Sequence, residues 1–246
     1  MSKNWRHAVL LISLFAPLAV LFAWPPIAQD MRYHTYADTR AFFGIPHAFN
    51  VASNVSFLVI GALGLLSRQQ KHSYGAEVSW SVFFAGIACV AFGSAWYHLT
   101  PSNASLVWDR LPMTIAFMAL FAALLSEHLS EQLERVALPA AMIVGVGSIA
   151  WWHYADDLRL YAWVQFAPLL TIVLLWALYP ARYTRRSYLA WGLAFYLLAK
   201  FAEHADNAIF VYTAGVISGH TLKHLLAAMA PLCIYLMLRE REPIAA

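Results

Sequence analysis

The sequence predicts an all-α, polytopic membrane protein with seven core helices and a further helix at the N-terminus. Of its 246 residues, 61% are hydrophobic and only 12% are charged, and the mean hydropathy is +0.59. This composition lies well outside that of soluble domains. The apolar residues also form runs close to the roughly 20 residues that a helix needs to cross a bilayer. The net charge of +3 comes from basic residues that are not clustered as in a nucleic-acid-binding surface, so we expect no nucleic-acid partner.

The first apolar run covers residues 8 to 23 and is short for a membrane span. Lys3 and Arg6 precede it, so it is either a signal peptide or a retained helix. The flank WPPIAQD contains no small-x-small cleavage site, which favours a retained helix. We therefore assign residues 1–29 to an N-terminal hydrophobic helix, as anchor or signal, and residues 30–246 to the membrane domain.

A polar stretch, DMRYHTYADTRAFFGIPHA, separates the first run from the other runs and predicts a folded exterior loop. The next seven apolar runs predict the core helices. They cover about residues 49–67, 78–99, 105–127, 134–152, 160–179, 187–204 and 216–238.

The basic residues predict an orientation, because lysine and arginine favour cytoplasmic loops. With a cytoplasmic N-terminus, the inner segments hold most of them: Lys3, Arg6, Arg68, Lys71, Arg135, Arg182, Arg185, Arg186, Arg239 and Arg241. The outer loops hold fewer, namely Arg32, Arg40 and Arg159. This alternation supports the helix count, including the first run.

A pair of histidines marks the last predicted helix, in VISGHTLKHLLAAMAP. His220 and His224 are four residues apart, so a helix places both imidazoles on one face, where they can bind one metal ion. A zinc site takes three or four protein ligands, which requires another ligand from elsewhere. Ionisable groups within a membrane are costly and often functional, which favours this reading over an unliganded histidine pair.

The best further candidates lie in GSAWYHLTPSNASLVWDRLPM. His98 is near the end of one apolar run and Asp109 near the start of the next, with a turn at Pro101 between them. In the predicted topology His98, Asp109 and the histidine pair all lie near the outer face. A histidine near a helix end is often only an interfacial residue, but convergence at one depth favours a metal site.

Zinc held by three neutral imidazoles lowers the pKa of a bound water to about 7, which makes the water a nucleophile. Asp109 could take the proton. Ser94 is one turn before His98, so its hydroxyl could donate to an oxyanion. The alternative is that Ser94 is only a small residue that allows close helix packing beside Gly93 and Ala95.

These residues carry a resemblance. Ser94-x-x-x-His98, Asp109 followed by Leu111-Pro112-Met113, and His220-x-x-x-His224 together resemble the alkaline ceramidase family of seven-helix membrane hydrolases. The segment Asn50-Val51-Ala52-Ser53-Asn54 is similar to the N-x-x-S-N start of its first core helix. The segments GSAWYHLTPSNASLVWDRLPM and SGHTLKH are most similar to those of bacterial members of this family. Adiponectin-receptor relatives share the pattern of ligand residues more loosely.

The resemblance implies that His98, His220 and His224 hold zinc, that Asp109 orients and deprotonates the water, and that Ser94 stabilises the oxyanion. The implied reaction is hydrolysis of an N-acyl sphingoid lipid in the bilayer, at the exterior face of a bacterial inner membrane. The family's calcium-binding segment, D-W-C-E-x-N-Y, is replaced here by DMRYHTYADTR, with His47 near the position of a family glutamate. Two carboxylates among arginines make a poor calcium cage, which argues against calcium.

Lys200 and Glu203 are three residues apart and predict a structural salt bridge within the membrane. Glu203 is also a candidate to hydrogen-bond a zinc-ligating imidazole. Two other functions remain open: a zinc-containing receptor or structural bundle without hydrolysis, and a haem-binding cytochrome, which also uses paired histidines. No protein partner is indicated by the sequence.

Overall fold

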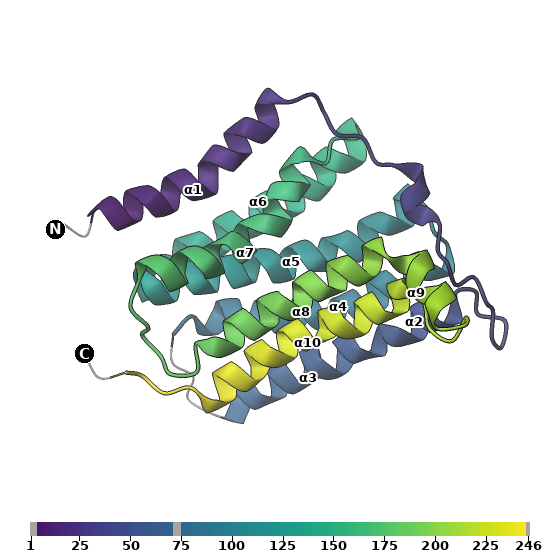
Figure 1. Cartoon of the computed structure of the whole chain (residues 1–246). Coiled ribbons are helices and arrows are strands. Elements are labelled where there is room, and N and C mark those ends of the chain that lie inside the picture. Colours follow the sequence, from purple (N-terminus) through teal and green to yellow (C-terminus); the bar gives the residue numbers. More distant parts are fainter. Residues whose placement is uncertain (1–3, 71–74, 245–246) are drawn as a thin grey trace.

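The computed structural model describes residues 4–70 and 75–244, and in these ranges the chain is a bundle of long helices (Figure 1). Lys3 and Lys71, which the predicted orientation uses, lie outside the described residues. The elements in chain order are α1 (Asn4–Ala23), η1 (Met31–His34), α2 (Ala48–Ser53), α3 (Val55–Gln70), α4 (Glu77–Leu99), α5 (Asn103–His128), η2 (Glu131–Leu133), α6 (Glu134–Ala155), α7 (Arg159–Leu178), α8 (Ser187–His204), α9 (Asp206–Tyr212) and α10 (Gly219–Glu240). The all-α prediction is confirmed.

In the described part of the chain, seven helical segments are long and apolar enough to cross a membrane, with α2 and α3 counted as one span. They include α1 but not α8, whose 18 residues end in a charged segment with Lys200 and Glu203. The helix α8 nevertheless runs the length of the bundle beside α10 (Figure 1). The two ends of the chain lie at the same end of the bundle, as the predicted even number of passes requires. The protein is a multi-pass membrane protein.

Helix boundaries differ from the predicted runs by up to four residues, and the largest difference is at the start of α1. We call the end of the bundle that the predicted orientation places outside the outer end, and the opposite end the inner end. At the outer end, polar side chains begin two of the helices. Ser102 and Ser105 form a reciprocal capping box that starts α5 directly after the turn at Pro101. Ser218 accepts a hydrogen bond from the Thr221 amide and starts α10. The short helix α9 was not predicted from the apolar pattern.

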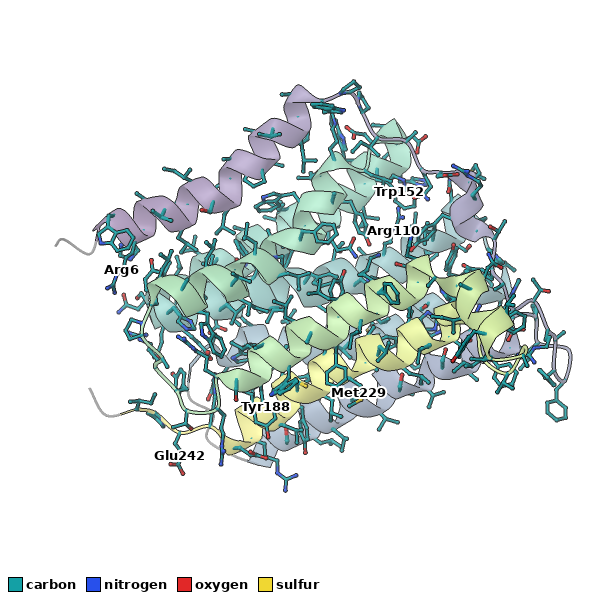
Figure 2. All side chains as sticks on the ribbon, in the orientation of Figure 1. Arg6, Arg110, Trp152, Tyr188, Met229 and Glu242 are labelled. Atoms are coloured by element: carbon teal, nitrogen blue, oxygen red, sulfur yellow. The ribbon has the colours of Figure 1, made fainter. Side chains whose placement is uncertain are left out.

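The core has two parts. The larger cluster fills the length of the bundle, and a smaller aromatic cluster around Tyr36, Tyr97 and Trp152 lies beneath the segment that connects α1 to α2. Figure 2 shows that side chains also project outward along the helices, and several large apolar ones are exposed, as expected of a surface that faces lipid.

The packing of α4 against α5 is unusually close at one point. A Cβ atom on Gly93 would lie 1.9 Å from the Trp108 carbonyl oxygen, so no larger residue fits there. This contact brings the outer ends of α4 and α5 together, and with them the next residues, Ser94 and Asp109.

Candidate metal centre

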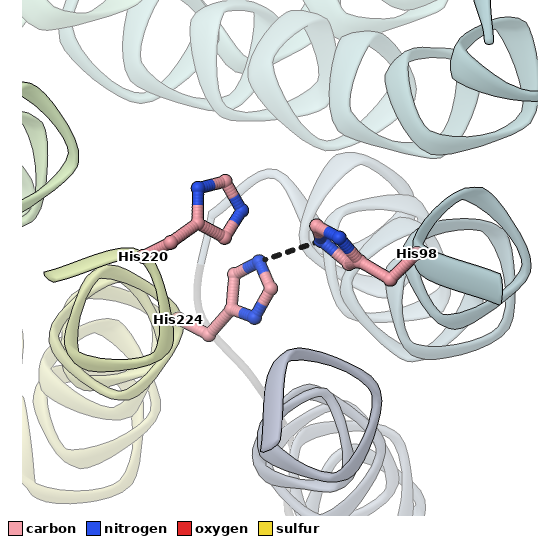
Figure 3. A group of neighbouring side chains, drawn as sticks. All are labelled: His98, His220 and His224. Carbon is pink, nitrogen blue, oxygen red and sulfur yellow. Dashed lines mark hydrogen bonds between the residues drawn. The ribbon is translucent and has the colours of Figure 1, made fainter. Parts of the chain in front are cut away.

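The three predicted ligand histidines come together in the structure (Figure 3). His98 is in the last turn of α4, and His220 and His224 are in the first turns of α10. One ligand nitrogen from each lies within 4.8 Å of the other two. All three residues are buried, and each pair of rings has a centroid separation of 4.9 Å.

This donor set fits a metal ion. The Nε2 atoms of His98 and His224 are 3.3 Å apart. Two nitrogens bound to tetrahedral zinc at about 2.0 to 2.1 Å would have a separation of roughly 3.3 Å. Among the described residues, the buried His220 Nε2 atom has no hydrogen-bond partner. Because unsatisfied buried polar atoms are costly, such a group is better explained as a ligand site than as packing.

The orientation of His224 is set by α2. The Ser53 hydroxyl donates to the Asn50 carbonyl oxygen at 3.0 Å and lies 2.8 Å from His224 Nδ1. A hydroxyl has one proton, so Ser53 must accept from the imidazole, which places the His224 proton on Nδ1. The lone pair of Nε2 then points toward His98, as required of a metal ligand.

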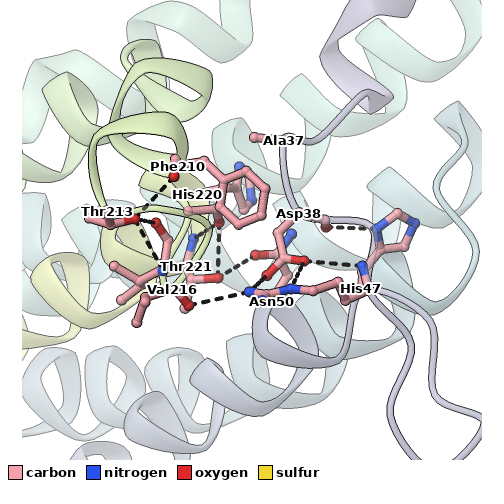
Figure 4. A network of polar contacts seen from close by, with 12 residues as sticks. Ala37, Asp38, His47, Asn50, Phe210, Thr213, Val216, His220 and Thr221 are labelled. Carbon is pink, nitrogen blue, oxygen red and sulfur yellow. Dashed lines mark hydrogen bonds and ion pairs between the residues drawn. The ribbon is translucent and has the colours of Figure 1, made fainter.

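A second network holds the start of α10 (Figure 4). The Asp206 carboxylate accepts from the His220 amide at 2.7 Å and from the Ala37 amide at 2.9 Å. The Thr221 hydroxyl donates to the Asn50 side chain at 2.7 Å. These bonds join α9, α10, α2 and the connecting segment, so His220 is positioned by three separate parts of the chain.

The carboxylates of the connecting segment are engaged by arginines. Arg40 pairs with Asp38 at 2.7 Å and Arg32 pairs with Asp30 at 2.8 Å. The adjacent guanidinium of Arg40 lowers the pKa of Asp38 from its usual value, because the ionised carboxylate receives its hydrogen bonds. Both carboxylates on which a calcium site would depend are therefore bonded to arginine.

Asp109 and Ser94 lie beside the histidine group. The Asp109 side chain is buried, and the Ser94 hydroxyl is within hydrogen-bonding reach of its carboxyl group. Ser94, Asp109 and His224 all line one cavity. The structure thus brings the three predicted ligand histidines together, and it places Ser94 and Asp109 in the cavity that His224 lines.

The cavity has a volume of about 500 Å³ and mostly apolar walls. It extends from the polar residues at the outer end into the bundle between α3, α4, α5, α7, α8 and α10. A long channel of this kind suits an apolar chain attached to a small polar group, since ligand sites combine apolar walls with a few placed polar atoms.

Glu203 has two lysine partners. It forms the predicted salt bridge with Lys200, and it also pairs with Lys223 at 2.8 Å. Within the described chain, no hydrogen bond joins the Glu203 carboxylate to a ligand histidine, so its proposed contact with an imidazole remains a prediction. Lys223 was not identified as part of the site, although its position between the paired histidines is a signal for it.

The fold and site define a multi-pass helical membrane protein with a buried three-histidine group that could hold a metal ion. A comparison with protein-family models adds the family: the model described as Ceramidase matches residues 43–239. The chain belongs to the ceramidase family, which implies an amidohydrolase that acts on lipid amides. No curated protein matches the sequence.

Proposed function

We propose that this protein is a zinc-dependent membrane amidase that hydrolyses the amide bond of an N-acyl sphingoid lipid. The observation that carries the proposal is that His224, one of three buried histidines that could hold one metal ion, lines the same apolar cavity as Asp109 and Ser94. His98, His220 and His224 would hold the ion. Zinc supplies Lewis-acid chemistry at such a site and lowers the pKa of water to about 7.

The chain's own residues then account for the proton transfers. Asp109 takes a proton from the attacking water and later gives it to the departing amine nitrogen. The Ser94 hydroxyl donates to the oxygen of the amide carbonyl as negative charge develops there. The water oxygen bonds to the carbonyl carbon, the C–N bond breaks, and the products are a fatty acid and an amine.

The cavity supports a lipid substrate. Its apolar walls accommodate a hydrocarbon chain, while Ser94, Asp109 and His224 lie at one end. With the N-terminus cytoplasmic, this end faces the exterior side of the membrane, and a bacterial inner membrane is the proposed location. The amide would therefore be cleaved near the outer lipid headgroups.

The two other functions suggested by the histidines fit less well. The three imidazole rings pack directly against one another, with centroids 4.9 Å apart, which leaves no space for a porphyrin between any pair. A receptor or structural zinc site would not require Ser94 and Asp109 to be buried together beside the histidines.

Fatty-acid release from N-acyl sphingoid lipids by the purified protein tests the proposal. We expect hydrolysis by the wild type, loss of activity on zinc chelation, and recovery when zinc is returned. Asp109→Asn should lower kcat by about 10²- to 10⁴-fold, the usual contribution of a general base. Glu242→Gln is the matched control, because it also replaces a carboxylate by an amide, but at an exposed position at the other end of the bundle. No hydrolysis by the wild type, or full activity in Asp109→Asn, would contradict the proposal.

A further inference from the structure

Arg110 is a buried cation held in an aromatic environment beside the candidate site (Figure 2). It directly follows Asp109 in α5, and only 5% of its surface is exposed. Its guanidinium carbon lies 4.3 Å from the Trp152 ring centroid, 4.7 Å from that of Tyr161 and 5.4 Å from that of Tyr33. These rings fix the guanidinium in place but do not neutralise it.

The guanidinium is incompletely bonded. Its Nη2 atom donates to Gln29 Oε1 at 2.7 Å, while the buried Nη1 atom has no hydrogen-bond partner. Among the described residues, no carboxylate forms an ion pair with Arg110. The buried Arg159 and Arg241 do have such partners, in Asp157 and Glu127. A buried cation without an anion is costly, and within a membrane protein it indicates a functional site.

An anion that pairs with Arg110 could lie in the cavity. Arg110 lines the same cavity as Asp109 and Lys223. Lys200 and Lys223 share the carboxylate of Glu203, so that anion is already paired. Asp30, which also lines the cavity, is bonded to Arg32. Asp109, the third carboxylate that lines the cavity, forms no ion pair with Arg110 among the described residues and is the proposed base. The positive charge of Arg110 is therefore left for a ligand that enters the cavity.

We propose that Arg110 binds an acidic headgroup on the amide lipid, a carboxylate, phosphate or sulfonate, and so selects anionic substrates over neutral ones. The proposal rests on the proposed function, because it places the headgroup one residue along α5 from Asp109. A guanidinium is suited to the planar, multidentate recognition of such oxyanions. The fatty acid released by hydrolysis also carries a carboxylate that Arg110 could bind. The experiment distinguishes the headgroup of the substrate from the carboxylate of this product.

The test compares amide lipids with the same acyl chain and either an acidic or a neutral headgroup. We expect wild-type kcat/KM to be about tenfold or more higher for the acidic lipid, mainly through a lower KM, since a hydrogen bond to a charged group typically contributes this much. Arg110→Gln should remove the preference and leave the neutral substrate nearly unaffected. Arg110→Lys should retain part of it, and Arg135→Gln, at an exposed arginine that does not line the cavity, should retain all of it.

Binding gives a readout independent of hydrolysis. Alkyl sulfonate, alkyl maltoside and fatty acid of matched chain length are titrated against the protein, followed by tryptophan fluorescence. The sulfonate should bind about tenfold more tightly to the wild type than to Arg110→Gln, and the maltoside equally to both. If no amide lipid is hydrolysed but this difference is found, the proposed function fails and the anion site stands.

Three results would overturn the inference: equal kcat/KM of the wild type for acidic and neutral lipids, equal sulfonate binding by the wild type and Arg110→Gln, or an effect of Arg110 on fatty-acid binding alone. The last result would assign the guanidinium to the product. Should Arg110→Gln fail to fold, the wild-type headgroup preference and the Arg110→Lys variant still decide the question.

Discussion

The two ends of the bundle differ in how their buried charged side chains and histidines are bonded. At the inner end, the Glu127 carboxylate accepts from Arg241 at 2.6 and 2.8 Å, from Trp80 Nε1 at 2.7 Å and from the Ala76 amide at 3.3 Å. At the outer end, His220 Nε2 and Arg110 Nη1 are buried without a hydrogen-bond partner among the described residues.

The difference distinguishes stability from function. A buried charge with all its hydrogen bonds made within the chain joins helices and needs no ligand, as Glu127 does between α4, α5 and the segment after α10. Buried nitrogens left without partners have their bonding capacity available for something that enters. The bundle is therefore expected to respond to substitutions at its inner end by losing stability, and at its outer end by losing ligand binding or catalysis.

The largest effect on stability is expected from Glu127→Gln, which breaks the inner cluster. The variant removes the carboxylate charge that pairs with the buried Arg241, which should lower the free energy of unfolding by about 3 to 5 kcal/mol. Thermal or denaturant unfolding in detergent measures it, with Glu131→Gln, at an exposed position, as the matched control. Equal unfolding of Glu127→Gln and the wild type would show that the cluster is not a stabilising contact.

At the outer end, Ser94→Ala should lower kcat by about 10²- to 10³-fold, because one oxyanion donor is removed. Its unfolding midpoint and zinc content should stay close to wild type. Ser79→Ala is a matched control, since Ser79 is buried in the same helix but does not line the cavity. Wild-type kcat in Ser94→Ala would instead support a purely packing role for this serine.

Ser53→Ala sharpens the comparison by removing the hydrogen-bond partner of His224 while leaving the ligand histidines intact. Zinc affinity should fall by about 10- to 100-fold, the usual effect of losing such a supporting bond. Competition with a chelator of known affinity measures it. Ser56→Ala is the control, because the Ser56 hydroxyl bonds only to a backbone carbonyl oxygen in the same part of the chain. Unchanged affinity would mean that packing alone orients His224.

The smallest effect is expected at Asp157, part of a satisfied ion pair at the outer end. It accepts from Arg159 and from Trp151, and these bonds lower the pKa of its carboxyl group. A lowered pKa stabilises the folded state above the ordinary pKa of aspartate, and this contribution disappears as the pH falls through the folded value. Arg159 keeps its hydrogen bond to the Trp24 carbonyl oxygen in Asp157→Asn, so this variant should unfold only slightly earlier at pH 7, by about 1 kcal/mol. The difference should shrink below about pH 4, and a pH-independent difference would contradict it.

The sequence predicted the helices better than it predicted the environment of the site. The long apolar runs predicted the bundle, and the spacing of His220 and His224 predicted that both lie on one helix face, because helical periodicity is a local property. The contacts of Ser53 with His224, and of Asp206 with the His220 amide, depend on helices far apart in the chain. No role for Arg110 was predicted from the sequence, since its lack of an anionic partner is visible only once the neighbouring helices are placed.

The most direct test of the account is elemental analysis of the purified protein for zinc per chain. Wild type is compared with His220→Ala and with His153→Ala, which removes an exposed histidine at the same end of the bundle. The account predicts close to one zinc per chain in the wild type and in His153→Ala, and a clear loss in His220→Ala. Absence of zinc from the wild type, or zinc content that is indifferent to His220, would contradict the proposed metal centre and the mechanism built on it.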